Sequence, residues 1–464
     1  MSSEQNSQPG HGKRPRSLFR HPDFMKLWAG DTISQLGTQV TMLALPITAI
    51  VILRANAFQT GLLTTVQFLP FILVGLPAGV WVDRLRRRPI LIIGDLGRAL
   101  VLGSIPIAYA IQQLHMVQLY IVAFVAGVFT VFFDVAYQSY LPSLVDRDQL
   151  VDGNAKLEIS RSGAQLAGPG LAGALIQLLK APVAVLVDSL SYLWSASWVF
   201  FIRRKEPPVE FRDADGAKPK MRGQIADGWR YVWRHPLLRP IAFCTANSNL
   251  FSAMSQAILI LYAIRVLGLN AGSIGLIFTI DNIGFLGGAF VARRIADRLG
   301  VGPTIIGAAM MFGSTGVLVP LATRATAFPL LIAWLTVGGF GGVVYNINQV
   351  SLRQAITPDR MQGRMNATMR FMVWGTLPVG AFIGGVLGKT VGLKPTLWVA
   401  AIGGVVSFVP PLLSPVRRLE RIPEMGELGP DRQGVAESVV SGDEGLLAHE
   451  HLPSVEGHGE AEGS

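Results

Sequence analysis

Charged residues are scarce in this chain. Asp, Glu, Lys and Arg make up 15% of its 464 residues, whereas 50% of them are hydrophobic and the mean hydropathy is +0.43. A soluble domain carries about a quarter charged residues, because polar side chains must cover its surface. The shortage excludes an ordinary soluble protein and indicates a chain whose outer surface faces lipid.

Cysteine clusters, histidine clusters and nucleotide motifs are missing as well. Cys244 is the only cysteine, so the chain can form neither an internal disulfide nor a cysteine-based metal site. The seven histidines fall in predicted tails or loops, and no phosphate-binding glycine loop is present. We therefore expect no metal, no cofactor, no enzymatic activity and no ATP-driven step.

Apolar sequence, in contrast, is abundant and occurs in long runs. A hydrocarbon core of about 30 Å needs roughly 20 apolar residues in a helix. Twelve runs meet this requirement: 31–53, 59–82, 89–111, 117–141, 154–178, 182–202, 241–263, 272–293, 302–322, 327–350, 366–388 and 393–413. The sequence thus predicts an all-α membrane protein with twelve transmembrane helices.

Basic residues mark one side of the membrane. If the N-terminus is cytoplasmic, 30 of the 40 Lys and Arg residues fall in tails and loops on that side, and only six lie in loops on the other. The positive-inside rule then predicts a multi-pass cell-membrane protein with both termini in the cytoplasm. Because topology accounts for the formal charge of +10, we expect the lipid bilayer and no nucleic acid as a partner.

The connections between runs divide the chain into five expected parts. These are a tail (1–26), a six-helix bundle (27–202), a linker (203–240), a second six-helix bundle (241–415) and an acidic, Gly-rich tail (416–464). Within the linker, residues 225–234 place aromatics at helical spacing beside basic residues. This pattern predicts an amphipathic helix at the membrane surface.

The two halves share short sequence patterns. The triplet Asp83–Leu85 after the second run recurs as Asp297–Leu299 after the eighth. Asn154-Ala155 at the start of the fifth run recurs as Asn366-Ala367 at the start of the eleventh. These matches indicate a duplicated six-helix unit, which places a substrate site near the midplane between the halves.

The loop after the second run reads Gly79-x-x-x-Asp83-Arg84-x-Arg86-Arg87-Arg88. It resembles the signature loop of the major facilitator superfamily, which usually has Gly where Arg86 stands here. The run of residues Gly168, Pro169 and Gly173 is similar to the family's antiporter motif. Three further patterns resemble its drug and siderophore exporters: Phe24-x-x-Leu27-Trp28, Asp188-x-Leu190-Ser191-Tyr192 and Pro358-Asp359-Arg360.

The resemblance implies the major facilitator fold, with two pseudo-symmetric six-helix bundles. It also implies a proton-coupled antiporter, powered by the proton gradient, that exports amphipathic small molecules by alternating access. An importer or facilitator with the same fold stays open, as does a non-transporting receptor or scaffold. We expect a monomer with a small-molecule substrate.

The loop motif is a candidate gate. Gly79 allows close approach of another helix, and Asp83 can pair with arginines or with a helix N-terminus in the other half. Alternatively, Arg84, Arg87 and Arg88 only fix the topology. The glycines and proline of the fifth run either bend that helix against a facing one or serve ordinary packing.

Charged residues inside the predicted spans are candidate proton-coupling sites, because each costs at least about 2.5 kcal/mol unless it is paired or hydrated. Asp95 and Arg98, three residues apart on one helix, can pair with each other. Asp134 and Arg161 lie at similar depth in neighbouring runs and form either a breakable proton site or a permanent ion pair. Asp281 has no basic neighbour and is either a second proton site or a neutral, hydrogen-bonded acid.

Polar residues on the seventh, tenth and eleventh runs are candidates to line the substrate cavity. The alternative is that their side chains pack helices together by hydrogen bonds. They are Asn247, Asn249, Tyr345, Asn346, Asn348, Gln349 and Arg370.

Overall fold

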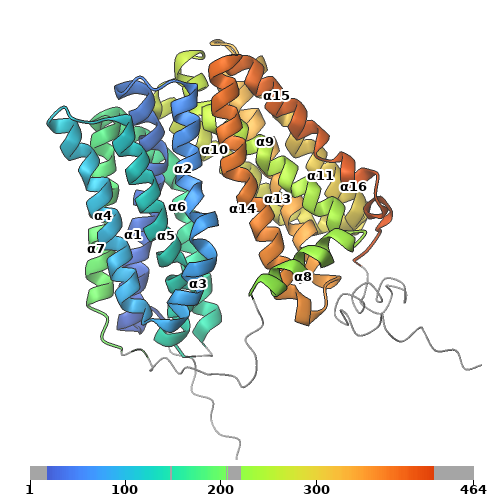
Figure 1. The fold of residues 1–464 in the computed structure, drawn as a ribbon, viewed down its shortest axis with the longest axis horizontal. Coiled ribbons are helices and arrows are strands. Elements are labelled where there is room, and N and C mark those ends of the chain that lie inside the picture. The colour runs from blue at the N-terminus through green and yellow to red at the C-terminus, as the bar shows by residue number, and fades with distance from the viewer. Residues whose placement is uncertain (1–17, 147–148, 205, 207–220, 423–464) are drawn as a thin grey trace, which may run out of the picture.

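The computed structural model describes residues 18–146, 149–204, 206 and 221–422. Nearly all of these residues are helical, and none of them lies in a strand. Figure 1 shows two helical bundles side by side, with the single helix α8 (Met221–Arg234) between them in the chain. Most of the predicted acidic tail lies outside the described residues.

The first bundle contains six membrane-length elements. They are α1 (Pro22–Ile47) continued by η2 (Thr48–Ile52), α2 (Ala57–Leu73) with α3 (Gly75–Arg84), α4 (Arg87–Ala110), α5 (Met116–Leu144), α6 (Leu150–Leu179) and α7 (Ala181–Phe200). A short turn, η1 (Leu18–Arg20), precedes them.

The second bundle also contains six. They are α9 (Leu238–Arg265), α10 (Ala271–Leu299), α11 (Val301–Thr315) with α12 (Leu318–Leu321), α13 (Ala327–Ala355), α14 (Asp359–Thr390), and α15 (Leu393–Val406) with α16 (Val409–Leu412). The turn η4 (Pro415–Arg418) follows them. Each predicted run corresponds to one element, so the twelve-helix fold is confirmed.

In the described part of the chain, nine of these elements are long and apolar enough by composition to cross a membrane. The other three are the broken pair α2 and α3 and the more polar helices α6 and α9. The break at Val74 has a local cause: Pro77 has no N–H to donate to the carbonyl of Leu73, so the helical ladder is interrupted there.

Helix α1 begins well before the predicted run at residue 31. It starts at Pro22, whose fixed φ suits a first helical turn, and His21 caps it by accepting a hydrogen bond at Nδ1 from the N–H of Phe24 at 3.0 Å. The earlier start places Asp31 inside the helix rather than at its edge.

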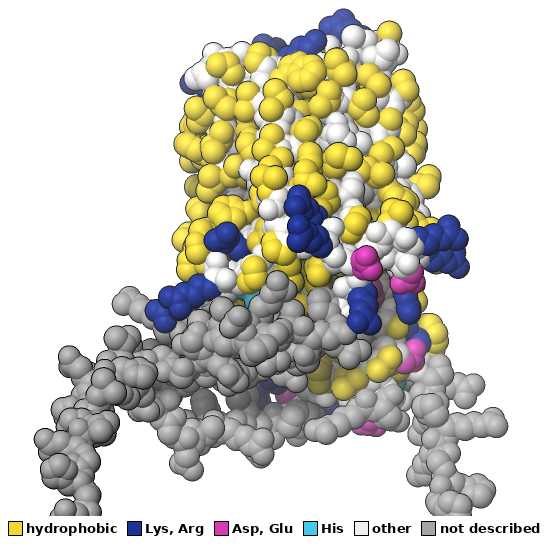
Figure 2. Space-filling view, turned by 90° about the vertical axis from the view of Figure 1, so that its right-hand side faces the viewer, with side chains coloured by type: hydrophobic (Ala, Val, Ile, Leu, Met, Phe, Trp, Pro, Cys, Tyr) yellow, Lys and Arg dark blue, Asp and Glu magenta, His cyan; other side chains and the backbone are white. Residues whose placement is uncertain are grey.

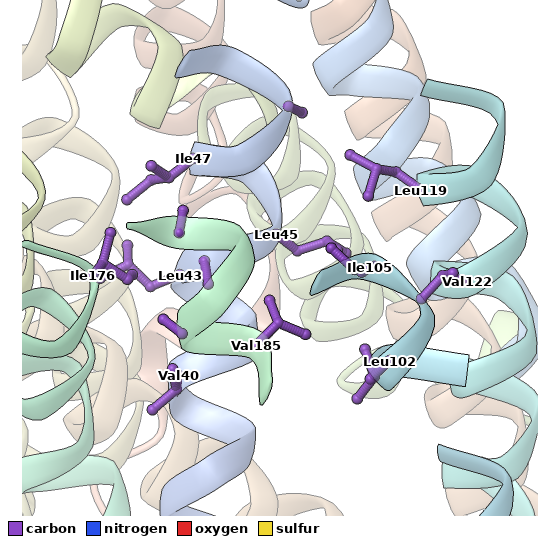
Figure 3. Packing of buried hydrophobic residues seen from close by; sticks show 14 of the residues in the cluster. Val40, Leu43, Leu45, Ile47, Leu102, Ile105, Leu119, Val122, Ile176 and Val185 are labelled. Atoms are coloured by element: carbon purple, nitrogen blue, oxygen red, sulfur yellow. The ribbon is translucent and has the colours of Figure 1, made fainter. Parts of the chain in front are cut away.

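The packed hydrophobic cores lie within the bundles and also join them, because the cluster of the first bundle takes in Ala263 and Ile274 of the second. Figure 3 shows part of this cluster, with Leu43 of α1 beside Ile176 of α6. Because lipid tails are as apolar as these side chains, close packing rather than exclusion of water holds the helices together. Seen from one side, the outer surface is a hydrophobic band flanked by basic residues (Figure 2).

The two ends of the molecule differ. We call the end with α8, Leu18 and Ile422 the terminal end, and the opposite one the distal end (Figure 1). The halves meet through α2 with α14 and through α6 with α10. Glycines near the distal end allow this approach: a Cβ on Gly61 would lie 2.4 Å from Cα of Gly385, and one on Gly275 would lie 2.4 Å from the carbonyl oxygen of Pro169.

At the terminal end the halves are apart. The main contacts of α3 are with α2 and α5 of its own half. A Cβ on Gly79 of α3 would meet no atom within 4 Å, and the same holds for Gly363 of α14. The expected close approach of a helix to Gly79 therefore does not occur in this conformation, because the halves separate here and join only towards the distal end.

We call the contacts of Gly61 with Gly385 and of Gly275 with Pro169 and Gly173 the distal seam. A larger side chain in this seam should push the two halves apart. Gly61→Leu has no room against Gly385, and an overpacked contact costs about 1–3 kcal/mol, which shifts a two-state equilibrium by about five- to 150-fold. In the background Cys244→Ser, Thr65→Cys should then react faster with a membrane-impermeant maleimide added at the distal side. Gly307→Leu is the control, because its Cβ meets open space. Equal labelling rates in the two variants would show that the seam does not close the distal end.

Candidate functional site

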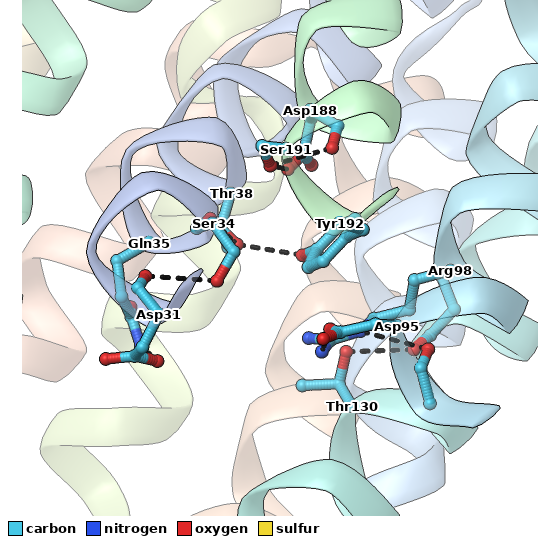
Figure 4. Close-up of polar contacts among 12 residues, drawn as sticks. Asp31, Ser34, Gln35, Thr38, Asp95, Arg98, Thr130, Asp188, Ser191 and Tyr192 are labelled. Carbon is cyan, nitrogen blue, oxygen red and sulfur yellow. Dashed lines mark hydrogen bonds and ion pairs between the residues drawn. The ribbon is translucent and has the colours of Figure 1, made fainter. Parts of the chain in front are cut away.

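The first bundle buries an arginine at its centre. Arg98 of α4 is 5% exposed, and its Nη2 donates to Oδ1 of Asp95 at 2.5 Å. The guanidinium also lies over the ring of Phe133 on α5, at 4.2 Å from the centroid, and that of Tyr192 on α7, at 4.1 Å. The predicted pair of Asp95 and Arg98 thus forms. Aromatic faces on two neighbouring helices hold its cation in place (Figure 4).

Asp188 of α7 lies within electrostatic reach of this guanidinium. It is 0% exposed and accepts a hydrogen bond at Oδ1 from Ser191 Oγ at 3.1 Å. Gly37 of α1 packs closely against Asp188, since a Cβ on Gly37 would lie 2.6 Å from Oδ1 of Asp188. Close to this carboxylate, Tyr192 and Thr38 share a hydrogen bond of 2.8 Å between their hydroxyls (Figure 4).

Two more carboxylates face the same cation. Asp31 of α1 is 3% exposed, accepts a hydrogen bond from Gln35 at 3.3 Å and lies within electrostatic reach of Arg98. Asp134 of α5 is also within reach of Arg98. Its side chain, unlike that of Asp31, is exposed.

The predicted contact between Asp134 and Arg161 is not made. Arg161 of α6 is exposed and acts on Asp134 only electrostatically, since the ion pairs within 4.0 Å in the described part of the chain do not include them. Arg98, buried among aromatic rings, is the cation that α5 actually faces. The depths of residues along their helices could not identify Arg98 as the cation near Asp134, because Arg98 belongs to α4 and not to α6.

We call Asp31, Asp95, Asp134 and Asp188 the carboxylate cluster. At 1.5 Å per residue, Asp95 lies about 12 Å into α4 from Arg87, and Asp188 lies about 18 Å into α7 from Phe200. One guanidinium can neutralise one carboxylate, and an unpaired charge at such depth is costly. The remaining carboxylates must therefore be hydrated, protonated or paired with a cationic ligand.

The second bundle has a single acidic candidate. Asp281 of α10 is half-buried beside Gly339 of α13, where a Cβ would lie 2.7 Å from its Oδ1. That oxygen is buried without a hydrogen-bond partner among the described residues. Neither a cation nor a second carboxylate joins it there, so the two halves differ in their buried charge.

The predicted cavity residues divide into two that bond to a neighbouring helix, three that bond within their own helix and two that are exposed. Asn247 donates to the carbonyl of Gly403 at 2.9 Å and to Ser407 Oγ at 2.8 Å, which fastens α9 to α15. The other amides and the tyrosine bond locally or to a neighbouring helix: Asn249 to Thr245, Asn348 to Val344, Gln349 to Asn346 and Tyr345 to Thr245. Asn346 and Arg370 have exposed side chains.

The arginines of the loop motif act within the first half. Glu206 accepts the N–H groups of Arg87 and Arg88 at 2.8 and 2.6 Å, and so caps the start of α4. The side chain of Arg88 donates to the carbonyls of Val199 and Phe200 at the end of α7. Arg84 is exposed, and the side chain of Asp83 lies outside the described part.

The motif of the fifth span packs α6 between two helices. A Cβ on Gly168 would lie 2.4 Å from the side chain of Gln39 on α1. One on Gly173 would lie 2.8 Å from the carbonyl oxygen of Ala271 on α10, and the carbonyl of Pro169 faces Gly275. Pro169 and Gly173 therefore belong to the contact between the halves, whereas Gly168 packs within the first bundle. Among the described residues, no group of three or more His, Cys, Asp or Glu can hold a metal ion.

Removing the buried cation should destabilise the protein in a pH-dependent way. Arg98→Met leaves charged carboxylates unpaired, and breaking a buried pair costs about 3–5 kcal/mol. Protonated carboxyls need no counter-charge, so the loss should be large at pH 8 and recover towards pH 5. Thermal unfolding in detergent measures this, with the exposed Arg161→Met as the control. An equal loss at both pH values would mean that Arg98 contributes only packing.

Comparison with known proteins agrees with this geometry. The family of transmembrane secretion effectors, a major facilitator group, matches residues 14–442. The multidrug efflux pump Tap of Mycolicibacterium fortuitum is 25% identical over 85% of this chain and 97% of its own length. The enterobactin exporter EntS of Salmonella choleraesuis is 22% identical over 89% and 97%.

Solved structures share the fold. A bacterial homologue of the iron transporter ferroportin in an inward-facing state superposes with a TM-score of 0.69 at 17% identity, over 86% of this chain and 99% of that one. The nucleoside transporter NupG gives a TM-score of 0.65 at 13% identity, over 84% and 99%. These neighbours are membrane transporters. With the twelve helices, the two bundles and the family match, this chain belongs to the transmembrane secretion effector family of the major facilitator superfamily.

Proposed function

We propose that this transporter exports amphipathic small molecules in exchange for protons. The observation that carries this proposal is the carboxylate cluster, in which four acidic residues share one buried guanidinium. A bundle in lipid cannot keep so many unpaired charges, so protons are the simplest way to neutralise the excess. The energy source is then the proton gradient across the cell membrane.

In this mechanism, Asp134 is where protons and substrate meet. It is the exposed member of the cluster, whereas Asp31, Asp95 and Asp188 are buried. An amphipathic substrate, cationic or rich in hydrogen-bond donors, binds best when Asp134 is charged. Protonation from the distal side weakens that binding, so the substrate leaves as the proton arrives. Arg98 is a positioning residue that redistributes its attraction among the carboxylates as they gain and lose protons.

The switch between access states uses the distal seam. The halves meet at Gly61 with Gly385 and at Gly173 with Gly275, and they are apart at the terminal end. We assign the terminal end to the cytoplasm because most Lys and Arg residues gather there. In this orientation the conformation is open to the cytoplasm. Closing it would bring Gly79 and Asp83 towards the second half, which is the gating role proposed for that motif.

The direction of transport is inferred from the relatives. Tap is named a multidrug efflux pump and EntS an enterobactin exporter. A macrolide efflux protein of Streptococcus pyogenes is 24% identical over 39% of this chain and 44% of its own length. These names support export, and we extend them to this chain as a proposal; the described residues hold no group of three or more His, Cys, Asp or Glu that could bind a metal ion.

Replacing the carboxylates by neutral amides should separate substrate binding from proton coupling. Asp134→Asn and Asp188→Asn cannot gain and lose a proton, so they should still exchange substrate down its gradient but lose uphill transport. Uptake of externally added ethidium or a macrolide by energised inverted membrane vesicles measures this. A protonophore should abolish wild-type uptake, while added ATP should not change it.

Two other variants sharpen the result. Asp152→Asn is the matched control, because Asp152 lies on the exposed start of α6 beside Lys156 and outside the cluster. Asp281→Asn tests the separate acid of the second bundle. If the Asp134 and Asp188 variants still concentrate substrate, and only Asp281→Asn fails, the coupling site lies in the second bundle and this assignment is wrong.

A further inference from the structure

A groove opens on the outer side of the second bundle, at the terminal end. It has a volume of about 440 Å³ and lies between the end of α8, the start of α9 and the segment from α16 to η4. Trp233, Phe243, Leu413 and several prolines line it, together with Arg239 and Ser414. The volume is within the range of small-molecule sites, and the groove lies far from the carboxylate cluster of the first bundle.

One wall of the groove is aromatic. Trp229 and Trp233 stack one helical turn apart on α8, with ring centroids 5.3 Å apart, and Trp233 also contacts Phe243 of α9 at 5.1 Å. Trp233 is 39% exposed, Phe243 43% and Leu413 76%. Tryptophan rings are enriched where the hydrocarbon core meets the headgroups, because they are apolar with one polar edge. The wall therefore belongs to the membrane interface.

Helix α8 is fixed firmly enough to form such a wall. Its opposite face is buried in the second bundle, where Tyr231 and Val232 are each 1% exposed. Tyr231 donates its hydroxyl to the carbonyl of Ile356 at 3.3 Å, and Gly228 lies close to the backbone of Arg364 on α14. The tryptophans consequently point away from the bundle, into the groove and towards lipid.

The one charged residue that lines the groove is basic, and the described charged residues next to the lining in the sequence are basic as well. Arg239 lies in its lining, and Arg230, Arg234, Arg417 and Arg418 flank it with exposed side chains. The stretches 228–243 and 409–419, which form and border it, contain no Asp or Glu. Glu420 is the first acidic residue after them, and its backbone lies against Gly300. A groove with apolar walls and a basic mouth is complementary to an anionic amphiphile.

We propose that this groove binds one anionic phospholipid of the surrounding bilayer. The phosphate would pair with Arg239 and the flanking arginines, and an acyl chain would run along Phe243 and Leu413 towards the hydrocarbon core. Because α8 contributes one wall and α9 and α16 the other, the lipid would fasten the linker helix to the second bundle. A basic residue near the membrane surface contributes about 1 kcal/mol towards binding anionic lipid, or about fivefold in affinity.

The acidic tail after Ile422 is the competing occupant. It begins shortly after η4 and carries the opposite charge to the arginines. The groove walls, however, are mainly aromatic and aliphatic, and the tail offers few large apolar residues to fill them. These walls favour an acyl chain over the tail. The experiment below therefore includes binding of the tail as the alternative result.

The experiment measures binding of phosphatidylglycerol and phosphatidylcholine to the full-length protein in neutral detergent, by native mass spectrometry and by the shift in Tm. Phosphatidylglycerol should bind more tightly and raise Tm more. Arg239→Gln should weaken it about fivefold, whereas Arg294→Gln, an exposed arginine of α10 outside the groove, should leave binding unchanged. Leu413→Glu should weaken phosphatidylglycerol more than Leu413→Gln does, because only the former adds a repelling charge.

Three results would overturn the proposal. One is equal binding of the two lipids by the wild-type protein. Another is equal weakening by Arg239→Gln and Arg294→Gln, which would mean a diffuse charge effect. The third is a severalfold gain in phosphatidylglycerol binding when the chain is cut after Ile422, because the tail would then be the native occupant.

Discussion

The guanidinium of Arg98 lies where a membrane protein tolerates charge least, and the first bundle is arranged around it. Asp95 pairs with it, Phe133 and Tyr192 cover its faces, and Asp188 and Asp31 lie within electrostatic reach. Because one guanidinium can neutralise one carboxylate, the remaining carboxylates of the bundle must be hydrated, protonated or paired with a cationic ligand. Packing and chemistry therefore depend on the same residue.

The second constraint is close helix approach at one end only. Glycines join the halves near the distal end, at Gly61 with Gly385 and at Gly173 with Gly275. At the terminal end, Gly79 has no neighbour across the gap. Van der Waals contact between small residues holds this seam, together with hydrogen bonds such as that from the Thr65 hydroxyl to the carbonyl of Pro378. None of the ion pairs in the described part of the chain joins the two halves, so the proposed separation breaks no ion pair.

Most of the fold could be predicted from the sequence, because lipid demands long apolar runs and each run corresponds to one membrane-length element, whether one helix or a broken pair. Helix starts were harder. Asp31 was taken as the edge of a run, but His21 and Pro22 start the helix earlier and bury that carboxylate. The break at Val74 was also missed, although Pro77 marks it.

Pairing within one helix was predictable and pairing between helices was not. Asp95 and Arg98 are three residues apart, and their spacing alone indicates contact. Asp134 and Arg161 have matching depths, yet depth does not give the rotation of two helices about their axes, and they do not pair. In the same way, Asn247 suggested a cavity residue, but its amide bonds to Gly403 and Ser407.

The central claim is that the carboxylate cluster holds exchangeable protons because Arg98 cannot neutralise it alone. Infrared spectra of the purified protein at neutral pH test this most directly, through the C=O stretching band of protonated carboxyl groups. The account predicts such a band in the wild type, a clear loss of its intensity in Asp188→Asn or Asp31→Asn, and no change in the exposed control Asp152→Asn. A spectrum without protonated carboxyl groups at neutral pH would contradict it.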